Sequence, residues 1–104
     1  MVKKINEAEF SEAEGKAAAV IDFNAVWCGP CRMLGPVLSE LSDEYTGKVD
    51  FYSVDVDQNQ DLAVKYGISS IPALIVLKDG KEAGRQVGFA PKPALKSFID
   101  NAIG

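Results

Sequence analysis

The stretch Trp27-Cys28-Gly29-Pro30-Cys31 lies at a boundary between two kinds of hydrophobic pattern. The residues from Ala17 to Asn24 are almost continuously apolar, which predicts a buried central strand. The residues after the stretch are apolar at steps of three and four, which predicts a helix that runs to about Tyr45. The apolar positions of that helix are Leu34, Val37, Leu38, Leu41 and Tyr45. The two cysteines are therefore expected where a strand ends and a helix begins.

The position of the cysteines at a helix N-terminus favours a reactive thiolate. The first amides of a helix have no intrahelical partner, and the helix dipole adds partial positive charge there. We therefore expect a lowered pKa and an exposed, nucleophilic sulfur at Cys28. Cys31 follows on the same helix face, about one turn deeper, so the two cysteines can close a small ring. Pro30 suits the first helical turn, where its missing N–H is not needed.

Two other interpretations of the cysteine pair have less support. Buried apolar filler is uncommon at this spacing on a strand-to-helix turn. A structural zinc site needs about four nitrogen or sulfur ligands, whereas the chain has two cysteines and no histidine. A metal site shared between two chains, or one that uses carboxylates, stays open, but the sequence predicts no metal.

Four segments of the chain resemble the thioredoxin family in their order and spacing. They are Asp22–Cys31, Ile71-Pro72, Lys78-Asp79-Gly80 and Val87-Gly88. The resemblance runs essentially from end to end. It implies an α/β thioredoxin fold, in which a central mixed five-stranded sheet is flanked by four helices. It also implies protein-disulfide reductase activity, and thioredoxin is itself a standard example of such cysteine chemistry.

Asp22 is an acidic residue inside an otherwise apolar strand. Burial disfavours the charged form of a carboxyl group and therefore raises its pKa. The resemblance implies that Cys28 attacks the target disulfide and Cys31 resolves the mixed disulfide. In that arrangement Asp22 lies behind Cys31 and exchanges a proton with it. The predicted catalytic residues are thus Cys28, Cys31 and Asp22, and the redox-active disulfide is expected between the two cysteines.

The resemblance also implies a cis peptide bond at Ile71-Pro72, although X-Pro bonds in folded proteins are cis only about 5–6% of the time. The backbone of the residue before that proline would pair with an extended segment of the target. Around it we expect a flat apolar surface for target proteins. The predicted binding residues are Trp27, Gly29, Pro30, Ile71, Pro72, Gly88 and Phe89.

Three residues depart from the usual pattern of the family. Asn24 stands in place of an aromatic residue, Arg32 in place of a lysine, and Ser53 where many bacterial members carry a lysine near the buried aspartate. If Asn24 faces the site, we expect looser apolar packing there. Without the second lysine, Asp22 has one fewer cationic neighbour and is expected to titrate higher.

The remaining segments alternate between predicted strands and helices, as in an α/β protein. In the first half, a short edge strand over Val2–Ile5 precedes a helix that ends near Glu14. A capping box of Asn6 and Glu9 opens this helix. Pro36 is expected to kink the long helix after the cysteines.

The second half begins with a strand from Val49 to Val56 and a helix that ends at Gly67. Asp57 or Asn59 is expected to cap this helix. The last predicted elements are two antiparallel strands, Ala73–Lys78 and Lys81–Val87, joined by Asp79-Gly80, and a closing helix with Leu95, Phe98, Ile99, Ala102 and Ile103 on its apolar face.

Composition limits the possible partners. A single domain over residues 1–104 is expected, because the chain is short and 47% hydrophobic. The net charge of −4 argues against nucleic acid and against an anionic membrane surface. The sequence has no apolar run of membrane-spanning length and no signal-peptide core near its start, so we expect a cytoplasmic protein. We also expect a monomer. No cofactor site is visible, so the resemblance implies recycling by a thioredoxin reductase that draws on NADPH.

Three functions stay open at this level. The first is reduction of disulfides in partner proteins, with a role in electron transport and cell redox homeostasis. The second is the same chemistry run as an oxidant or isomerase, although Gly-Pro between the cysteines resembles the reducing members more. The third is a binding subunit of a larger complex that has this fold and no redox turnover.

Overall fold

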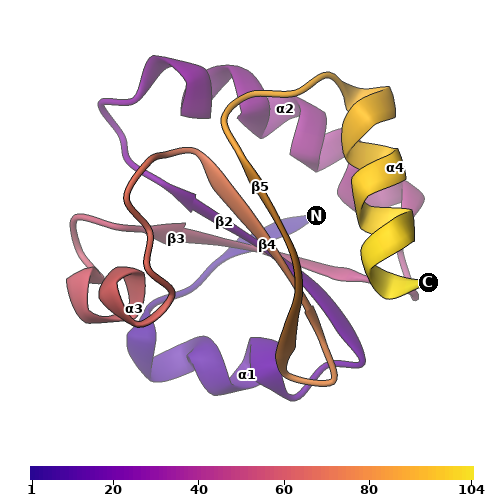
Figure 1. Cartoon of the computed structure of the whole chain (residues 1–104), viewed down its shortest axis with the longest axis horizontal. Helices are drawn as coiled ribbons and strands as arrows, with labels where there is room; N and C mark the ends of the chain where they lie inside the picture. The colour runs from indigo at the N-terminus through magenta and orange to yellow at the C-terminus, as the bar shows by residue number, and fades with distance from the viewer.

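The computed structural model describes residues 1–104 (Figure 1). The strands are β1 (Val2–Lys4), β2 (Ala18–Asn24), β3 (Asp50–Asp55), β4 (Ala73–Lys78) and β5 (Lys81–Val87). The helices are η1 (Glu7–Glu9), α1 (Phe10–Glu14), α2 (Gly29–Glu44), α3 (Gln60–Lys65) and α4 (Lys92–Ile103). The predicted elements are all present, and Pro36 lies inside α2 as expected.

The strands form one mixed sheet in the order β1-β3-β2-β4-β5, with β1 at an edge and β2 in the centre. β1 and β2 both pair with β3 in parallel, whereas β4 runs antiparallel to β2 and to β5. Asp79 and Gly80 join β4 to β5 with positive φ angles of 52° and 81°. This is the tight hairpin that an Asp-Gly pair predicts.

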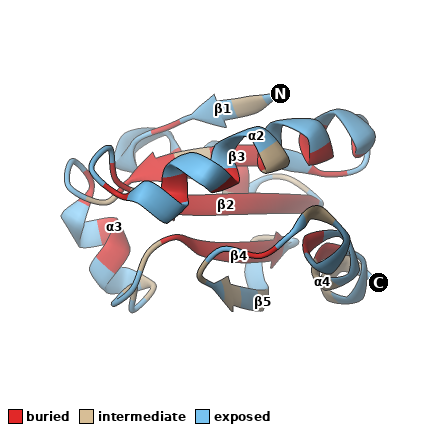
Figure 2. Ribbon diagram, turned by 90° about the horizontal axis from the view of Figure 1, so that it is seen from above, coloured by how far each residue is buried: buried red, intermediate tan, exposed pale blue.

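Helices cover both faces of the sheet. α2 and α4 lie over one face, and α1 and α3 lie over the other (Figure 1). Each pair of helices has its own cluster of buried apolar side chains against the strands. Because the central strands are covered on both sides, β2, β3 and β4 are mostly buried (Figure 2). Burial on both faces explains why the sequence of β2 is almost continuously apolar.

Alternation along β2 decides which side chains reach α2. Successive side chains of a strand point to opposite faces. Val20 packs with the α2 and α4 cluster, whereas Ile21 packs with the α1 and α3 cluster. Asp22 and Asn24 share the parity of Val20, so both lie on the face that α2 covers. Ser53 on β3 is the direct cross-strand neighbour of Asp22.

The start of α3 corrects one expectation from the sequence. Asn59 occupies the N-cap position, but its side chain does not cap the helix. The side chain instead accepts a hydrogen bond from the Glu7 N–H at 2.9 Å and donates one to the Asp55 carbonyl at 2.9 Å. The Glu7 carboxylate accepts a hydrogen bond from the Leu62 N–H at 3.1 Å, so a residue outside α3 bonds to a free N–H of its first turn. A partner distant in the sequence has replaced the local cap.

Replacing Asn59 with alanine is expected to lower the free energy of unfolding by about 1–3 kcal/mol. The side chain is buried, and its loss leaves the Asp55 carbonyl and the Glu7 N–H without their partners. Urea denaturation measures the change. The exposed neighbour Gln58 serves as the control, because Gln58→Ala is expected to change stability by about 0.5 kcal/mol or less. Equal stability of Asn59→Ala and the parent protein would contradict this role.

None of the helices has the length and apolar character needed to cross a membrane.

Candidate redox site

The cysteine pair lies at the N-terminus of α2, as predicted. Cys28 is the N-cap residue, and its sulfur accepts a hydrogen bond from the Cys31 N–H at 3.3 Å. A disulfide joins Cys28 to Cys31, and their Cα atoms lie 5.3 Å apart. Pro30 occupies the first turn, where no intrahelical hydrogen bond is lost. The end of β2 and the start of α2 therefore hold the two sulfurs together.

The expectation that Cys28 is exposed is wrong for this disulfide form. Cys28 is only 5% exposed and Cys31 only 6%. Both pack with Ala25, and the half-buried side chains of Val56 and Ile71 lie against this cluster. Ile71 comes from a loop distant in the sequence, so the cover over the disulfide was not visible in the local pattern.

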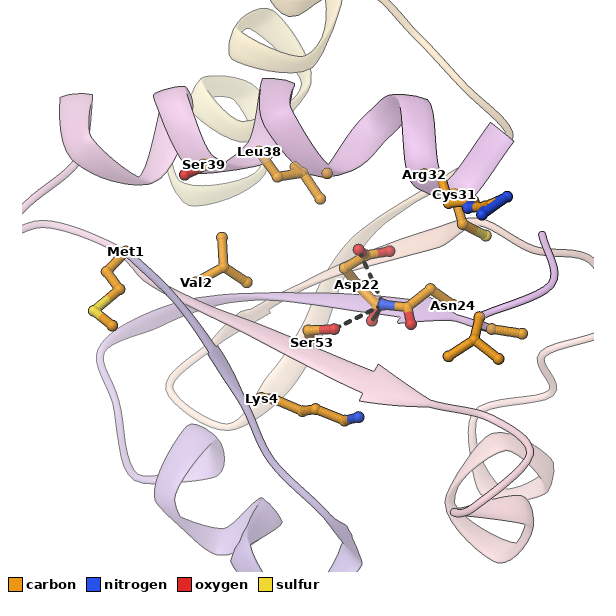
Figure 3. A pocket seen from close by; sticks show the side chains of 13 residues that line it. Met1, Val2, Lys4, Asp22, Asn24, Cys31, Arg32, Leu38, Ser39 and Ser53 are labelled. Carbon is orange, nitrogen blue, oxygen red and sulfur yellow. Dashed lines mark hydrogen bonds between the residues drawn. The ribbon is translucent and has the colours of Figure 1, made fainter. Parts of the chain in front are cut away.

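Asp22 lies beneath the cysteine pair in the interior. Asp22 and Cys31 line the same cavity of about 480 Å³, which lies between β1, the ends of β2 and β3, and α2 (Figure 3). Asp22 is 5% exposed, and its Oδ1 has no hydrogen-bond partner. Burial raises the pKa of Asp22 to about 6, and a hydrogen bond from Asn24 opposes the rise. The direction of the shift agrees with the effect of burial expected for Asp22. The further rise expected from the absence of a lysine at position 53 stays a prediction.

Asn24 faces the site, but it does not simply loosen the apolar packing. Its side-chain nitrogen donates to Asp22 Oδ2 at 3.1 Å and to Ser53 Oγ at 2.8 Å (Figure 3). It also lies 3.1 Å from the backbone carbonyl of Asp22. Two of the three departures from the family pattern therefore form one polar network around the buried acid. The third, Arg32, lines the rim of the same cavity.

The predicted target-binding residues differ in accessibility. Trp27 is 67% exposed and Phe89 43% exposed, and Gly29 and Pro30 are also exposed. The indole N–H of Trp27 donates to Asp57 Oδ2 at 2.7 Å, which fixes the orientation of the ring. Val26 and Met33 are further exposed apolar residues on either side of the cysteine pair in the sequence, and the sequence analysis did not include them.

The Ile71-Pro72 peptide bond is cis, as the resemblance implied. Pro72 is buried, and its carbonyl accepts a hydrogen bond from the Gly88 N–H at 2.8 Å. Gly88 is half-buried and has a φ of 88°. Ile71 is half-buried, and its backbone forms no backbone hydrogen bond within the chain. Ile71 therefore has a free backbone peptide group next to the disulfide, and the hydrogen bond between Gly88 and Pro72 anchors the loop.

The arrangement can carry out one kind of chemistry. Two cysteines at a helix N-terminus can cycle between a dithiol and a disulfide, and the helix dipole favours the thiolate that such exchange requires. A buried carboxyl group with a raised pKa shares a cavity with one of them. The fold and the site define a dithiol/disulfide oxidoreductase.

Comparison with known proteins agrees with this class. The thioredoxin family model matches residues 1–101 of the chain. Thioredoxins from Staphylococcus aureus strains MW2 and COL are each 44% identical to it over 102 residues, which is 98% of this chain and 98% of each relative. The chain belongs to the thioredoxin family. It is a disulfide reductase of the thioredoxin type, with Cys28 and Cys31 as its redox-active pair.

The role of Asn24 is the feature that sequence reasoning missed. A period of two along β2 puts Asn24 on the same face as Asp22, and that signal is present in the sequence. The pairing of β2 with β3, which brings Ser53 beside Asp22, is not a local signal. The amide network could therefore be suspected from spacing, but its partners required the structure.

Proposed function

We propose that the protein reduces disulfides in partner proteins by two successive exchanges. The Cys28 thiolate attacks one sulfur of the target disulfide, which forms a mixed disulfide and releases the first target thiolate. The Cys31 thiolate then attacks the Cys28 sulfur and releases the second target thiolate. Two electrons pass from the cysteine pair to the target, and the released thiolates take up protons. The observation that carries this proposal is the disulfide at the N-terminus of α2, above a buried carboxyl group.

Asp22 is proposed to accept the proton of the Cys31 thiol before the second exchange. Both residues line one cavity, and the unpartnered Oδ1 gives the carboxylate a free acceptor. A base with a pKa of about 6 is largely ionised at neutral pH and can still hold a proton briefly. The proton can then leave towards the open side of the cavity.

Targets are proposed to dock on the apolar surface around the cysteine pair. Trp27, Gly29, Pro30 and Phe89 provide exposed area, and Ile71 provides an unpaired backbone peptide. An extended target segment can add to such a peptide as a strand adds to a sheet edge. Pro72 and Gly88 would act by holding the Ile71 loop in place rather than by direct contact of Pro72.

The proposed partners are a thioredoxin reductase, which returns the disulfide to the dithiol, and disulfide-containing target proteins. The family membership of the chain supports both. We further propose a cytoplasmic, monomeric protein of one domain with a role in cell redox homeostasis. The redox-active cysteine pair is compatible with that location, because paired cysteines in a reducing compartment are more often catalytic than structural.

Replacing Asp22 with asparagine tests the proposed base. We expect resolution of the mixed disulfide to slow about a hundredfold near neutral pH, because the asparagine amide cannot accept a proton. The attack by Cys28 is expected to stay close to the parent rate. Attack is measured in a Cys31→Ser background as the rate of adduct formation with a disulfide-bonded protein. Resolution is measured as release of the target from a preformed mixed disulfide.

Asp50→Asn is the matched control for the change of charge, because Asp50 is exposed and outside the site. Equal slowing of both steps by Asp22→Asn, or slowing of neither, would remove Asp22 from the mechanism.

The alternative functions give different results in one further variant. Replacing both cysteines with serine abolishes reduction in a reductase, an oxidant or an isomerase. A binding subunit without redox turnover would keep its partner binding and its cellular role in the same variant.

A further inference from the structure

The side-chain amide of Asn24 is the only hydrogen-bond donor to the buried carboxyl group of Asp22. The amide nitrogen lies 3.1 Å from Oδ2 and 2.8 Å from Ser53 Oγ. Oδ1, the other carboxyl oxygen, has no partner. The two carboxyl oxygens of Asp22 are therefore not equivalent: Oδ2 accepts a hydrogen bond and Oδ1 does not.

The chemistry of the neighbours fixes which end of the amide faces Asp22. The carboxyl oxygen and the backbone carbonyl of Asp22 both accept hydrogen bonds, so the atom that faces them must be a donor. The amide nitrogen has two hydrogens for three acceptors, so one hydrogen is shared. Ser53, whose strand position is opposite Asp22, holds the amide from the side of β3.

We propose that Asn24, held by Ser53, is a positioning residue that occupies Oδ2 of Asp22 and leaves Oδ1 as the oxygen that takes the proton from Cys31. This inference rests on the proposed role of Asp22 in resolution. Asn24 makes the only hydrogen bond to the Asp22 carboxyl group, so it is the one polar contact that can fix the orientation of that group.

The charged groups around Asp22 do not bond to its carboxyl group. Lys4 on β1 and Arg32 on α2 line the cavity, as does Met1 at the start of the chain. None of them forms an ion pair with Asp22, and the amino group of Met1 pairs with Asp43 instead. Cys31 also lines the cavity, as one half of the disulfide. The Asn24 amide is thus the only polar group of the chain that bonds to the Asp22 carboxylate and can lower its pKa directly.

Asn24→Leu keeps the branched shape of the side chain and removes the donor. The Asp22 carboxyl group is then expected to titrate at a pH about one unit higher than in the parent, because the carboxylate loses its hydrogen bond. The acid limb of the pH profile for resolution should move by the same amount. Below both midpoints the resolution rate should fall about tenfold or more, because fewer molecules carry the Asp22 carboxylate. Above about pH 8.5, where the carboxylate is ionised in both proteins, a smaller deficit should remain because the carboxylate is no longer held by the amide.

The titration is followed by the NMR shift of the Asp22 carboxyl carbon in the oxidised protein, which does not depend on activity. Asn24→Asp is the second variant, because it keeps the shape of the side chain and replaces the donor with an acceptor. It is expected to raise the midpoint further, since two adjacent carboxyl groups disfavour the second charge. Ser39→Ala is the control, because Ser39 lines the same cavity and takes no part in the hydrogen bonds of the network.

The results separate the two proposals. If Asp22→Asn slows only resolution and the Asn24 variants leave both midpoints unchanged, the role of Asn24 is overturned and that of Asp22 survives. If Asp22→Asn slows both steps or neither, the proposed base fails, and the positioning role fails with it. Shifts of both midpoints in the Asn24 variants, with none in Ser39→Ala, support the inference.

Discussion

Replacing Cys31 with serine is expected to leave the protein attached to its target through Cys28. The first exchange needs only the Cys28 thiolate at the N-terminus of α2, but the second needs a sulfur at position 31. Turnover should fall by about a thousandfold or more, because the resolving nucleophile is lost. The mixed disulfide should accumulate and be visible by mass spectrometry after mixing with a disulfide-bonded protein.

Cys28→Ser is the matched variant and should form no adduct. The helix N-terminus assigns the attacking role to Cys28, since its sulfur lies at the N-cap and receives the Cys31 N–H. An adduct with Cys28→Ser but not with Cys31→Ser would reverse the two roles. The absence of an adduct in both variants would contradict the exchange mechanism.

Replacing Asp22 with asparagine is also expected to stabilise the protein, by about 3 kcal/mol at pH 7. Burial raises the pKa of Asp22 to about 6 in the folded protein, whereas the ordinary pKa of an aspartate side chain is 3.8. Between these values the folded state binds more protons than the unfolded chain, so stability falls as pH rises from about 4 to 6. Asparagine carries no charge at any of these pH values, so the variant does not lose stability through this ionisation as the pH rises.

Urea denaturation of the oxidised proteins at several pH values between 4 and 8 measures the effect. The stability gain of Asp22→Asn should be small at pH 4 and should reach its full size above about pH 6. Asp50→Asn is again the control and should change stability by about 0.5 kcal/mol or less. A gain that does not depend on pH would show that ionisation of Asp22 is not its cause.

A residue that costs stability in the folded protein is a candidate for function. Asp22 is buried with one unpartnered oxygen, which an apolar or neutral residue would avoid. Active sites often retain such costs because the chemistry requires the group. Slower resolution together with higher stability in Asp22→Asn would show directly that the protein loses stability to keep this functional group.

The sequence was sufficient where the signal was local. The change of hydrophobic period at the cysteines predicted the β2–α2 boundary, and Asp79-Gly80 predicted the hairpin. The family resemblance predicted the cis bond at Ile71-Pro72 and the overall fold.

The sequence was insufficient where a side chain has a distant partner. Asp57 or Asn59 was expected to cap α3, but neither side chain caps it, and the Asn59 side-chain oxygen accepts a hydrogen bond from the backbone N–H of Glu7, 52 residues away in the chain. Cys28 was expected to be exposed, but Ile71 packs over the pair. Asn24 was expected to loosen apolar packing, but Ser53 on the neighbouring strand and Asp22 engage its amide. In each case the register of the sheet or a loop decided the outcome.

The reduction potential of the Cys28–Cys31 pair tests the central claim most directly. The protein is equilibrated with defined ratios of reduced and oxidised glutathione, and the fluorescence of Trp27, the single tryptophan, reports the redox state. We expect a reversible couple with a potential more negative than that of the glutathione pool, as an electron donor to protein disulfides requires. A potential well above that of the pool would make the protein an oxidant or isomerase, and the lack of any reversible couple would contradict a redox function altogether.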